Sequence, residues 1–207
     1  MHKKLLSLSF IAITILLICS AALSIVSFTP VLYTHQFTKH HIYQEFPYPQ
    51  PAVDAELTTL LHYFYGNTPL HTNFFNQKEQ EHLNDVKQLL STLLLIFYSS
   101  FFLFFPFLAH IPHQQRAPLF ISASTTTLLL ALTLSIITLF NFNAFFLWFH
   151  KTTFTNTLWM LNPQTDNLIN LFPQAFFYDM FIYTLTLIAF LSISLLFIGI
   201  FHLKHKL

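Results

Sequence analysis

Long apolar runs alternate with polar segments along this chain. Four runs carry no charged residue and are long enough, at about 1.5 Å per helical residue, to cross roughly 30 Å of hydrocarbon. They are Leu5–Phe28, Leu89–Ala109, Leu119–Phe140 and Met180–Phe201. The pattern predicts an all-α integral membrane protein, a single membrane domain with four transmembrane helices.

The composition agrees with this fold class. Hydrophobic residues make up 54% of the 207 residues and charged residues only 8%, whereas about a quarter of the residues of a soluble domain are charged. The formal net charge of +1 gives no indication of a nucleic-acid partner. The single cysteine, Cys19, excludes a disulfide within the chain.

The first apolar run also resembles a signal peptide. Its apolar core is long, however, and no small-x-small cleavage site precedes a soluble domain. We therefore expect this run to be retained as a signal-anchor helix.

The distribution of charge predicts the orientation in the membrane. The basic residues next to the two termini and in the link between the second and third runs are Lys3, Lys4, Arg116, Lys204 and Lys206, and no acidic residue accompanies them. The acidic residues all fall in the two other connections. The positive-inside rule then places both termini in the cytoplasm and the loops 29–87 and 141–179 outside.

Both outer loops are expected to carry short interfacial helices. Leu57, Leu60, Leu61 and Phe64 recur at helical spacing within a predicted helix over Ala52–Tyr65. The proline-rich stretch before that helix is predicted to be irregular. In the second loop Asp166 is placed to cap a short helix that precedes Pro173.

The outer loops contain neither serine nor cysteine, and the whole chain has only two glycines. A Gly-x-Ser-x-Gly nucleophile elbow or a glycine-rich phosphate loop is therefore excluded. Histidine acid–base chemistry remains the main option at neutral pH. The candidates are His82, which shares a helical face with Glu79 and Asp85, and His150 at the outer end of the third run.

Two other functions stay open on the residues alone. Seven histidines fall in the outer loops: His35, His40, His41, His62, His71, His82 and His150. A zinc-dependent outer-face hydrolase would use some of them, but their spacing is irregular and matches no zinc motif. A non-enzymatic membrane scaffold or accessory protein would use the loops for binding. We expect no metal and no cofactor.

Two stretches resemble the signatures of a known family. "EQEHLNDVKQLL" before the second run is similar to a Glu-x-x-His-x-x-Asp-Val-Lys signature. "FHKTTFTNTLWMLNPQTDNLINLFPQAFFYD" before the fourth run is similar to a longer pattern that begins Phe-His and ends Phe-Phe-x-Asp. Both belong to the lipoprotein intramolecular transacylases, four-span bacterial membrane proteins, and the resemblance covers nearly the whole chain.

The resemblance implies an acyltransferase of the bacterial plasma membrane that works without an acyl-enzyme. Such an enzyme would move the sn-2 acyl chain of a diacylglyceryl lipoprotein to the α-amine of its N-terminal cysteine, giving a lyso-form lipoprotein. His150 and His82 would be the acid–base pair, with the assignment of base and acid left open. Asp85 or Glu79 would orient His82. Asn156, Trp159 and Asp166 are the candidates for oxyanion or substrate binding.

Overall fold

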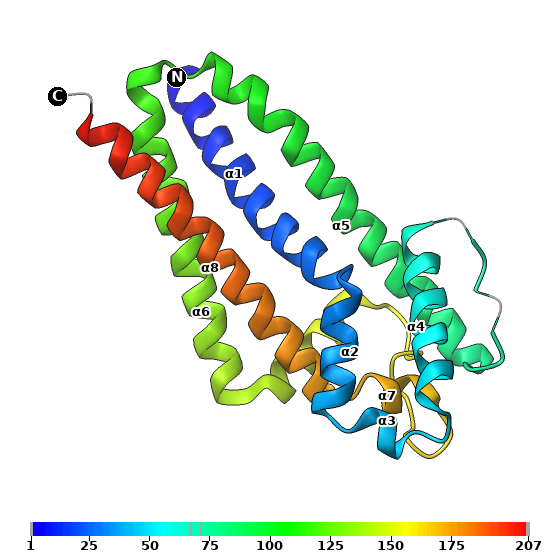
Figure 1. Cartoon of the computed structure of the whole chain (residues 1–207). Helices are drawn as coiled ribbons and strands as arrows, with labels where there is room; N and C mark the ends of the chain where they lie inside the picture. The colour runs from blue at the N-terminus through cyan, green and yellow to red at the C-terminus, as the bar shows by residue number, and fades with distance from the viewer. Residues whose placement is uncertain (1, 67, 71, 206–207) are drawn as a thin grey trace. The chain divides into compact units, whose positions relative to one another are not determined.

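The computed structural model describes residues 2–66, 68–70 and 72–205. Within these residues it contains eight helices and no strand (Figure 1). The helices are α1 (His2–Ser27), α2 (Pro30–Lys39), α3 (Ile42–Glu45), α4 (Gln50–Tyr65), α5 (Gln77–His110), α6 (His113–Thr153), α7 (Asn167–Leu171) and α8 (Gln174–Lys204). Four of them, α1, α5, α6 and α8, are long and apolar enough to span a membrane. The predicted fold class is therefore confirmed.

Helix α5 is longer than a bilayer requires. With 34 residues, it extends about 50 Å, against about 30 Å of hydrocarbon. The first three turns of α5 carry the charged residues Lys78, Glu79, Glu81, Asp85 and Lys87. These turns lie outside the charge-free run Leu89–Ala109, so α5 presents a polar extension beyond its apolar part.

The chain divides into two compact units, each made of segments that are distant in sequence. The first unit comprises the chain up to Ile25, Leu93–Leu139 and the chain from Ile182 onward. Its core cluster joins Phe10 of α1, Ile111 of the link and Phe120 of α6, with Leu195 of α8 packed against it. Phe104 of α5 packs against it too, so all four long helices contribute to one apolar core near that link.

Gly199 sets the approach of α8 to α6 within this first unit. A Cβ atom at this position would lie 3.2 Å from the carbonyl oxygen of Ala117 and 2.9 Å from Cγ1 of Ile121. The backbone oxygen cannot move aside as a flexible side chain could. The absence of a side chain at residue 199 therefore permits this close packing.

The second unit comprises Val26–Thr92 and Phe140–Phe181. The face of α4 that carries Leu57, Leu60, Leu61 and Phe64 is buried, which confirms the predicted helix apart from two extra residues at its start. Helix α2 was not predicted. It begins at Pro30, where the missing N–H of proline costs nothing, and buries Phe37 against Phe172 and Phe176.

Helix α6 contains a break at Asn141, whose φ of −160° and ψ of 82° are not helical. The Oδ1 atom of Asn141 accepts a hydrogen bond from the Ala144 N–H at 2.9 Å. The side chain therefore caps a second helical segment, residues 142–153. The sequence placed these residues in a loop, but the cap restarts the helix and carries it through His150.

Candidate active site

His150 lies three residues before the end of α6, within the second unit. Its Nδ1 atom is 2.8 Å from the carbonyl oxygen of Phe146, one turn earlier. A carbonyl oxygen only accepts, so Nδ1 carries the proton and the lone pair is on Nε2. The α6 backbone thus selects the tautomer that leaves Nε2 as a base.

His82 lies on the polar extension of α5 and faces His150. The centroids of the two rings are 6.4 Å apart and their planes are inclined by 37°. Both residues are buried, with 6% and 9% of their surfaces exposed. The structure therefore brings together two imidazoles that are 68 residues apart in the sequence.

Aromatic side chains surround the two imidazoles. The Trp159 ring lies 5.1 Å from His150, and Phe154 lies 5.1 Å from His82 and 5.6 Å from His150. Phe146 packs on His150 at 4.2 Å. These rings exclude water from much of the imidazole surface, which strengthens electrostatic interactions at the site.

Burial determines the charge of the pair, which lies outside the charge-free apolar runs. It lowers the pKa of His82 to about 4, and the neighbouring His150 adds to this effect while Asp85 opposes it. Burial also lowers the pKa of His150, against the opposing hydrogen bond to Phe146. Both imidazoles are therefore neutral at neutral pH and available to accept a proton.

Glu79 has partners other than those the sequence suggested. Its Oε2 atom accepts the Asn76 N–H at 2.7 Å, and the Oδ1 atom of Asn76 accepts the Glu79 N–H at 3.1 Å. Its Oε1 atom accepts the Leu168 N–H at 2.5 Å. Glu79 thus forms a capping box at the start of α5 and anchors α7. These bonds occupy both carboxylate oxygens, and none of the described hydrogen bonds reaches the buried Nδ1 of His82.

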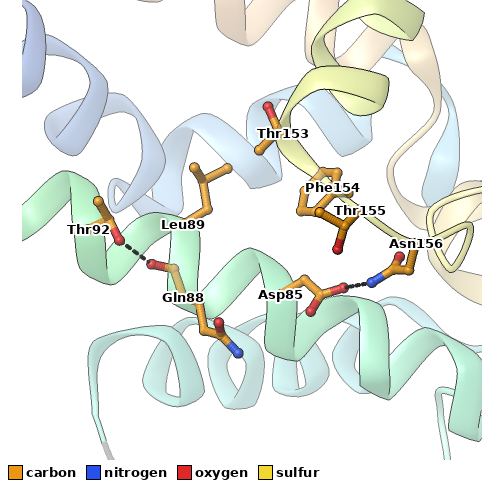
Figure 2. A pocket seen from close by; sticks show the side chains of 8 residues that line it. All are labelled: Asp85, Gln88, Leu89, Thr92, Thr153, Phe154, Thr155 and Asn156. Atoms are coloured by element: carbon orange, nitrogen blue, oxygen red, sulfur yellow. Dashed lines mark hydrogen bonds between the residues drawn. The ribbon is translucent and has the colours of Figure 1, made fainter.

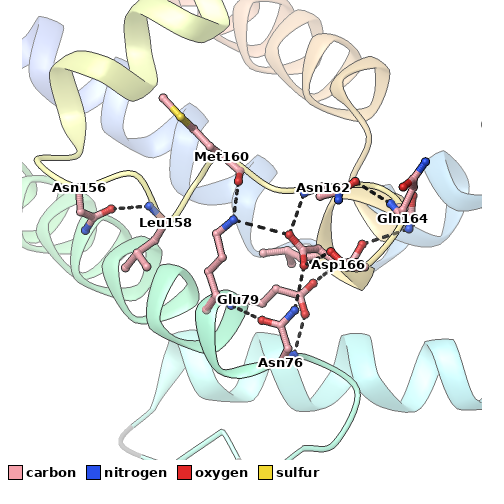
Figure 3. Close-up of polar contacts among 12 residues, drawn as sticks. Asn76, Glu79, Asn156, Leu158, Met160, Asn162, Gln164 and Asp166 are labelled. Atoms are coloured by element: carbon pink, nitrogen blue, oxygen red, sulfur yellow. Dashed lines mark hydrogen bonds and ion pairs between the residues drawn. The ribbon is translucent and has the colours of Figure 1, made fainter.

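Asp166 also serves the fold of the loop (Figure 3). It occupies the N-cap position of α7, as predicted, but its side chain does not cap that helix. The carboxylate instead accepts hydrogen bonds from the Asn162 N–H at 2.8 Å, the Asn76 amide at 3.0 Å and the Thr165 hydroxyl at 3.0 Å. Burial opposes its ionisation, but these bonds hold the pKa of Asp166 below its usual value. Both of its oxygens thus accept hydrogen bonds that hold the loop together.

Asp85 and Asn156 meet at the wall of a pocket. The Asn156 amide donates a hydrogen bond of 2.8 Å to the Asp85 carboxylate, and the Trp159 indole N–H donates to the Asn156 carbonyl oxygen at 3.0 Å. Eight residues line the pocket, which has a volume of about 250 Å³ (Figure 2): Asp85, Gln88, Leu89, Thr92, Thr153, Phe154, Thr155 and Asn156. Phe154, which also contacts both histidines, connects the pocket with the imidazole pair.

The other outer histidines that the structure describes do not join this pair in a group of metal ligands. Among the described residues no three His, Cys, Asp or Glu side chains come together as a metal site would require. His40 lies 2.7 Å from Asp179, which Lys39 also contacts, and His41 lies 3.0 Å from Gln44. His71 lies outside the described residues.

Comparisons with known proteins identify the family. The sequence matches the family described as lipoprotein intramolecular transacylase Lit over residues 7–177. This chain belongs to that family. The members are acyltransferases of lipoproteins, so the predicted enzyme class is confirmed and the chain is a multi-pass membrane transferase.

Solved transacylase structures share its fold. The lipoprotein intramolecular transacylase Lit from Bacillus cereus matches with a TM-score of 0.92 and 20% sequence identity, over 99% of this chain and 97% of that chain. Two variants of the Bacillus cereus protein, with a histidine replaced by arginine or by alanine, each match with a TM-score of 0.86 and 20% identity over 99% of this chain and 93% or 95% of theirs. No curated protein sequence matches this chain.

Sequence reasoning missed several parts of this transacylase site. The Phe146 carbonyl that fixes the His150 tautomer has no side-chain signal, although its place one turn before the histidine is a clue. Lys78, which donates to the Met160 carbonyl oxygen at 2.5 Å, was given no role from the sequence. Phe154 belongs to the matched signature but was not assigned a place beside both rings.

Proposed function

We propose that this transacylase moves the sn-2 acyl chain of a diacylglyceryl lipoprotein to the α-amine of the same molecule's N-terminal cysteine, with His150 as general base and His82 as its acid–base partner. The observation that carries this proposal is the pair of neutral imidazoles 6.4 Å apart. The Nε2 lone pair of His150 meets the first requirement of the reaction, which is to deprotonate the ammonium.

The reaction needs no nucleophile from the enzyme, because the substrate's own amine attacks the ester. Nε2 of His150 takes one proton from the α-ammonium, and the free amine attacks the ester carbonyl carbon. A C–N bond forms, the C–O bond to the glyceryl group breaks, and a second amine proton reaches the leaving oxygen through His82. His150 then releases its proton to water and returns to the neutral form. Because the donor and the acceptor share one molecule, binding alone brings them together. This agrees with outer loops that lack serine and cysteine.

Asn156 is our candidate donor to the tetrahedral oxyanion. An asparagine amide has two N–H groups, and one of them is bound to Asp85. The second is directed to no acceptor in the hydrogen bonds of the described residues. Trp159 fits a different role, since its N–H is bound within the loop and its ring covers His150.

We further propose that the site faces the exterior of the bacterial plasma membrane. In this orientation the loops 29–87 and 141–179 lie outside and both termini are cytoplasmic. The acidic residues are confined to those loops, and the remaining connection and the terminal segments are basic. A lipoprotein anchored in the outer leaflet would meet the histidine pair on that side.

The function can be tested in a bacterium that makes only diacylglyceryl lipoproteins. Expression of the wild-type chain is expected to yield N-acylated, lyso-form N-terminal peptides by mass spectrometry. His150→Gln removes the base and is expected to lower their yield by at least a hundredfold. His35→Gln, which changes an exposed histidine of α2, is the matched control. Unchanged diacyl peptides with the wild-type chain would overturn the proposal.

A further inference from the structure

The pocket beside Phe154 has a polar lining with one charged side chain. Six of its eight residues are polar, and Asp85 is the only one among them that carries a charge. Leu89 and Phe154 supply the apolar part. An acyl chain placed here would remove water from the carboxylate without replacing its hydrogen bonds, at a large cost in free energy. The lining therefore favours a polar ligand.

No described residue neutralises Asp85. Its hydrogen bond comes from the uncharged Asn156 amide, and the described ion pairs do not include it. Nearby lysines have other partners: Lys87 lies 4.1 Å above the Tyr63 ring, and Lys78 donates to Met160. The pocket thus offers a carboxylate that can receive a cation.

Resting on the proposed function, we propose that the Asp85 carboxylate, held in place by the Asn156 amide, forms the subsite for the α-ammonium of the lipoprotein's N-terminal cysteine. This group is the cation that the reaction must hold before it is deprotonated. Phe154 lines the subsite and contacts both imidazoles, and Asp85 lies one turn from His82 on α5 and acts on its pKa. The subsite therefore adjoins the imidazole pair. Thr153 and Thr155 also line this pocket.

The proposal assigns Asp85 a contact with substrate. The sequence suggested instead that Asp85 orients His82, but its observed partner is Asn156 at the pocket wall. A carboxylate that binds the ammonium selects for substrates with a free amine. An N-acylated product has lost that charge, so this subsite also favours product release.

A binding experiment separates this subsite from catalysis. The probe is a dialkylglyceryl cysteinyl peptide with both chains joined by ether bonds, so that no acyl group can transfer. The control probe is identical except that it lacks the α-amine. We expect wild-type protein in micelles to bind the amine-bearing probe about tenfold more tightly, and Asp85→Asn to abolish this preference. The asparagine retains an oxygen for the Asn156 amide, so the fold of the pocket is kept.

Two controls make the outcome decisive. Glu81→Gln removes one negative charge from an exposed position on the same helix and should retain the tenfold preference. His150→Gln should retain it too, while losing acyl transfer from an ester substrate. Equal binding of the two probes by wild-type protein, or a preference that survives in D85N, would overturn the subsite. If the preference holds but wild-type protein transfers no acyl chain, the proposed function fails and the ammonium subsite stands.

Discussion

At the scale of single residues, the two imidazoles differ in their support. The Phe146 carbonyl holds His150, whereas none of the described hydrogen bonds reaches Nδ1 of His82. Signature motifs predicted both histidines as an acid–base pair, and the structure places their rings 6.4 Å apart. The carboxylates were harder to assign. Glu79 shares a helical face with His82, yet its oxygens bind backbone N–H groups of residues 76 and 168. Helical spacing shows which side chains can meet on one helix. It does not show that backbone N–H groups of a distant loop will bind one of those side chains instead.

The lowered pKa of His82 predicts a loss of stability in acid. An unfolded histidine has a pKa of about 6.5, whereas burial brings the pKa of His82 to about 4. Between these two pH values the folded protein binds fewer protons than the unfolded chain. The free energy of unfolding is therefore unaffected by this group above about pH 6.5 and falls as the pH is lowered toward 4. At about 1.4 kcal/mol per unit of pKa difference, the loss of unfolding free energy amounts to at most roughly 3 kcal/mol.

Thermal unfolding in detergent at pH 7.5 and pH 5 measures this effect. His82→Gln should show a smaller fall in Tm between the two pH values than the wild-type protein. His35→Gln should behave like the wild type, because His35 is exposed. Equal falls in all three proteins would contradict the prediction.

At the scale of elements, helix interiors were predictable and helix ends were not. The buried face of α4 follows from its apolar spacing, and α5 continues from its polar turn into its apolar run as expected. The third apolar run was predicted to end at Phe140, and the break does fall at Asn141. The helical segment after the break was missed because it depends on a side-chain cap. Helix α2 was missed because its first residue is a proline, which suggested a loop.

The capping box at the start of α5 predicts a stability cost at Glu79. Glu79→Ala leaves the N–H groups of Asn76 and Leu168 without their acceptors, and we expect the free energy of unfolding to fall by about 2–3 kcal/mol. Glu81→Ala removes a carboxylate bonded only to Gln77 among the described residues and should cost less than about 0.5 kcal/mol. Thermal unfolding compares the two variants, and similar losses would show that the box contributes little.

At the scale of the whole molecule, length and hydropathy sufficed for four membrane-spanning helices. The division into two compact units was not predictable, because each unit combines segments from three or two distant parts of the sequence. Charge asymmetry predicts the sidedness, a property of the membrane environment rather than of internal packing.

Single-cysteine labelling tests that orientation. In a Cys19→Ala background, His62→Cys in the first outer loop should react in intact cells with a maleimide that cannot cross the membrane. Gln114→Cys in the Arg116 link should react only after the cells are lysed. Both positions are exposed, so a difference in labelling reflects the side of the membrane. The reverse pattern would invert the proposed topology.

The bond between His150 and the Phe146 carbonyl makes the orientation of this imidazole independent of the side chain at position 146. In a serine protease an aspartate holds the catalytic imidazole, and a single substitution there sets the wrong nitrogen free. Here the anchor is a main-chain oxygen, which every residue type at position 146 provides. Substitutions around the ring can change the reaction rate. They leave the tautomer of His150 unchanged as long as the helical turn from residue 146 to residue 150 is intact.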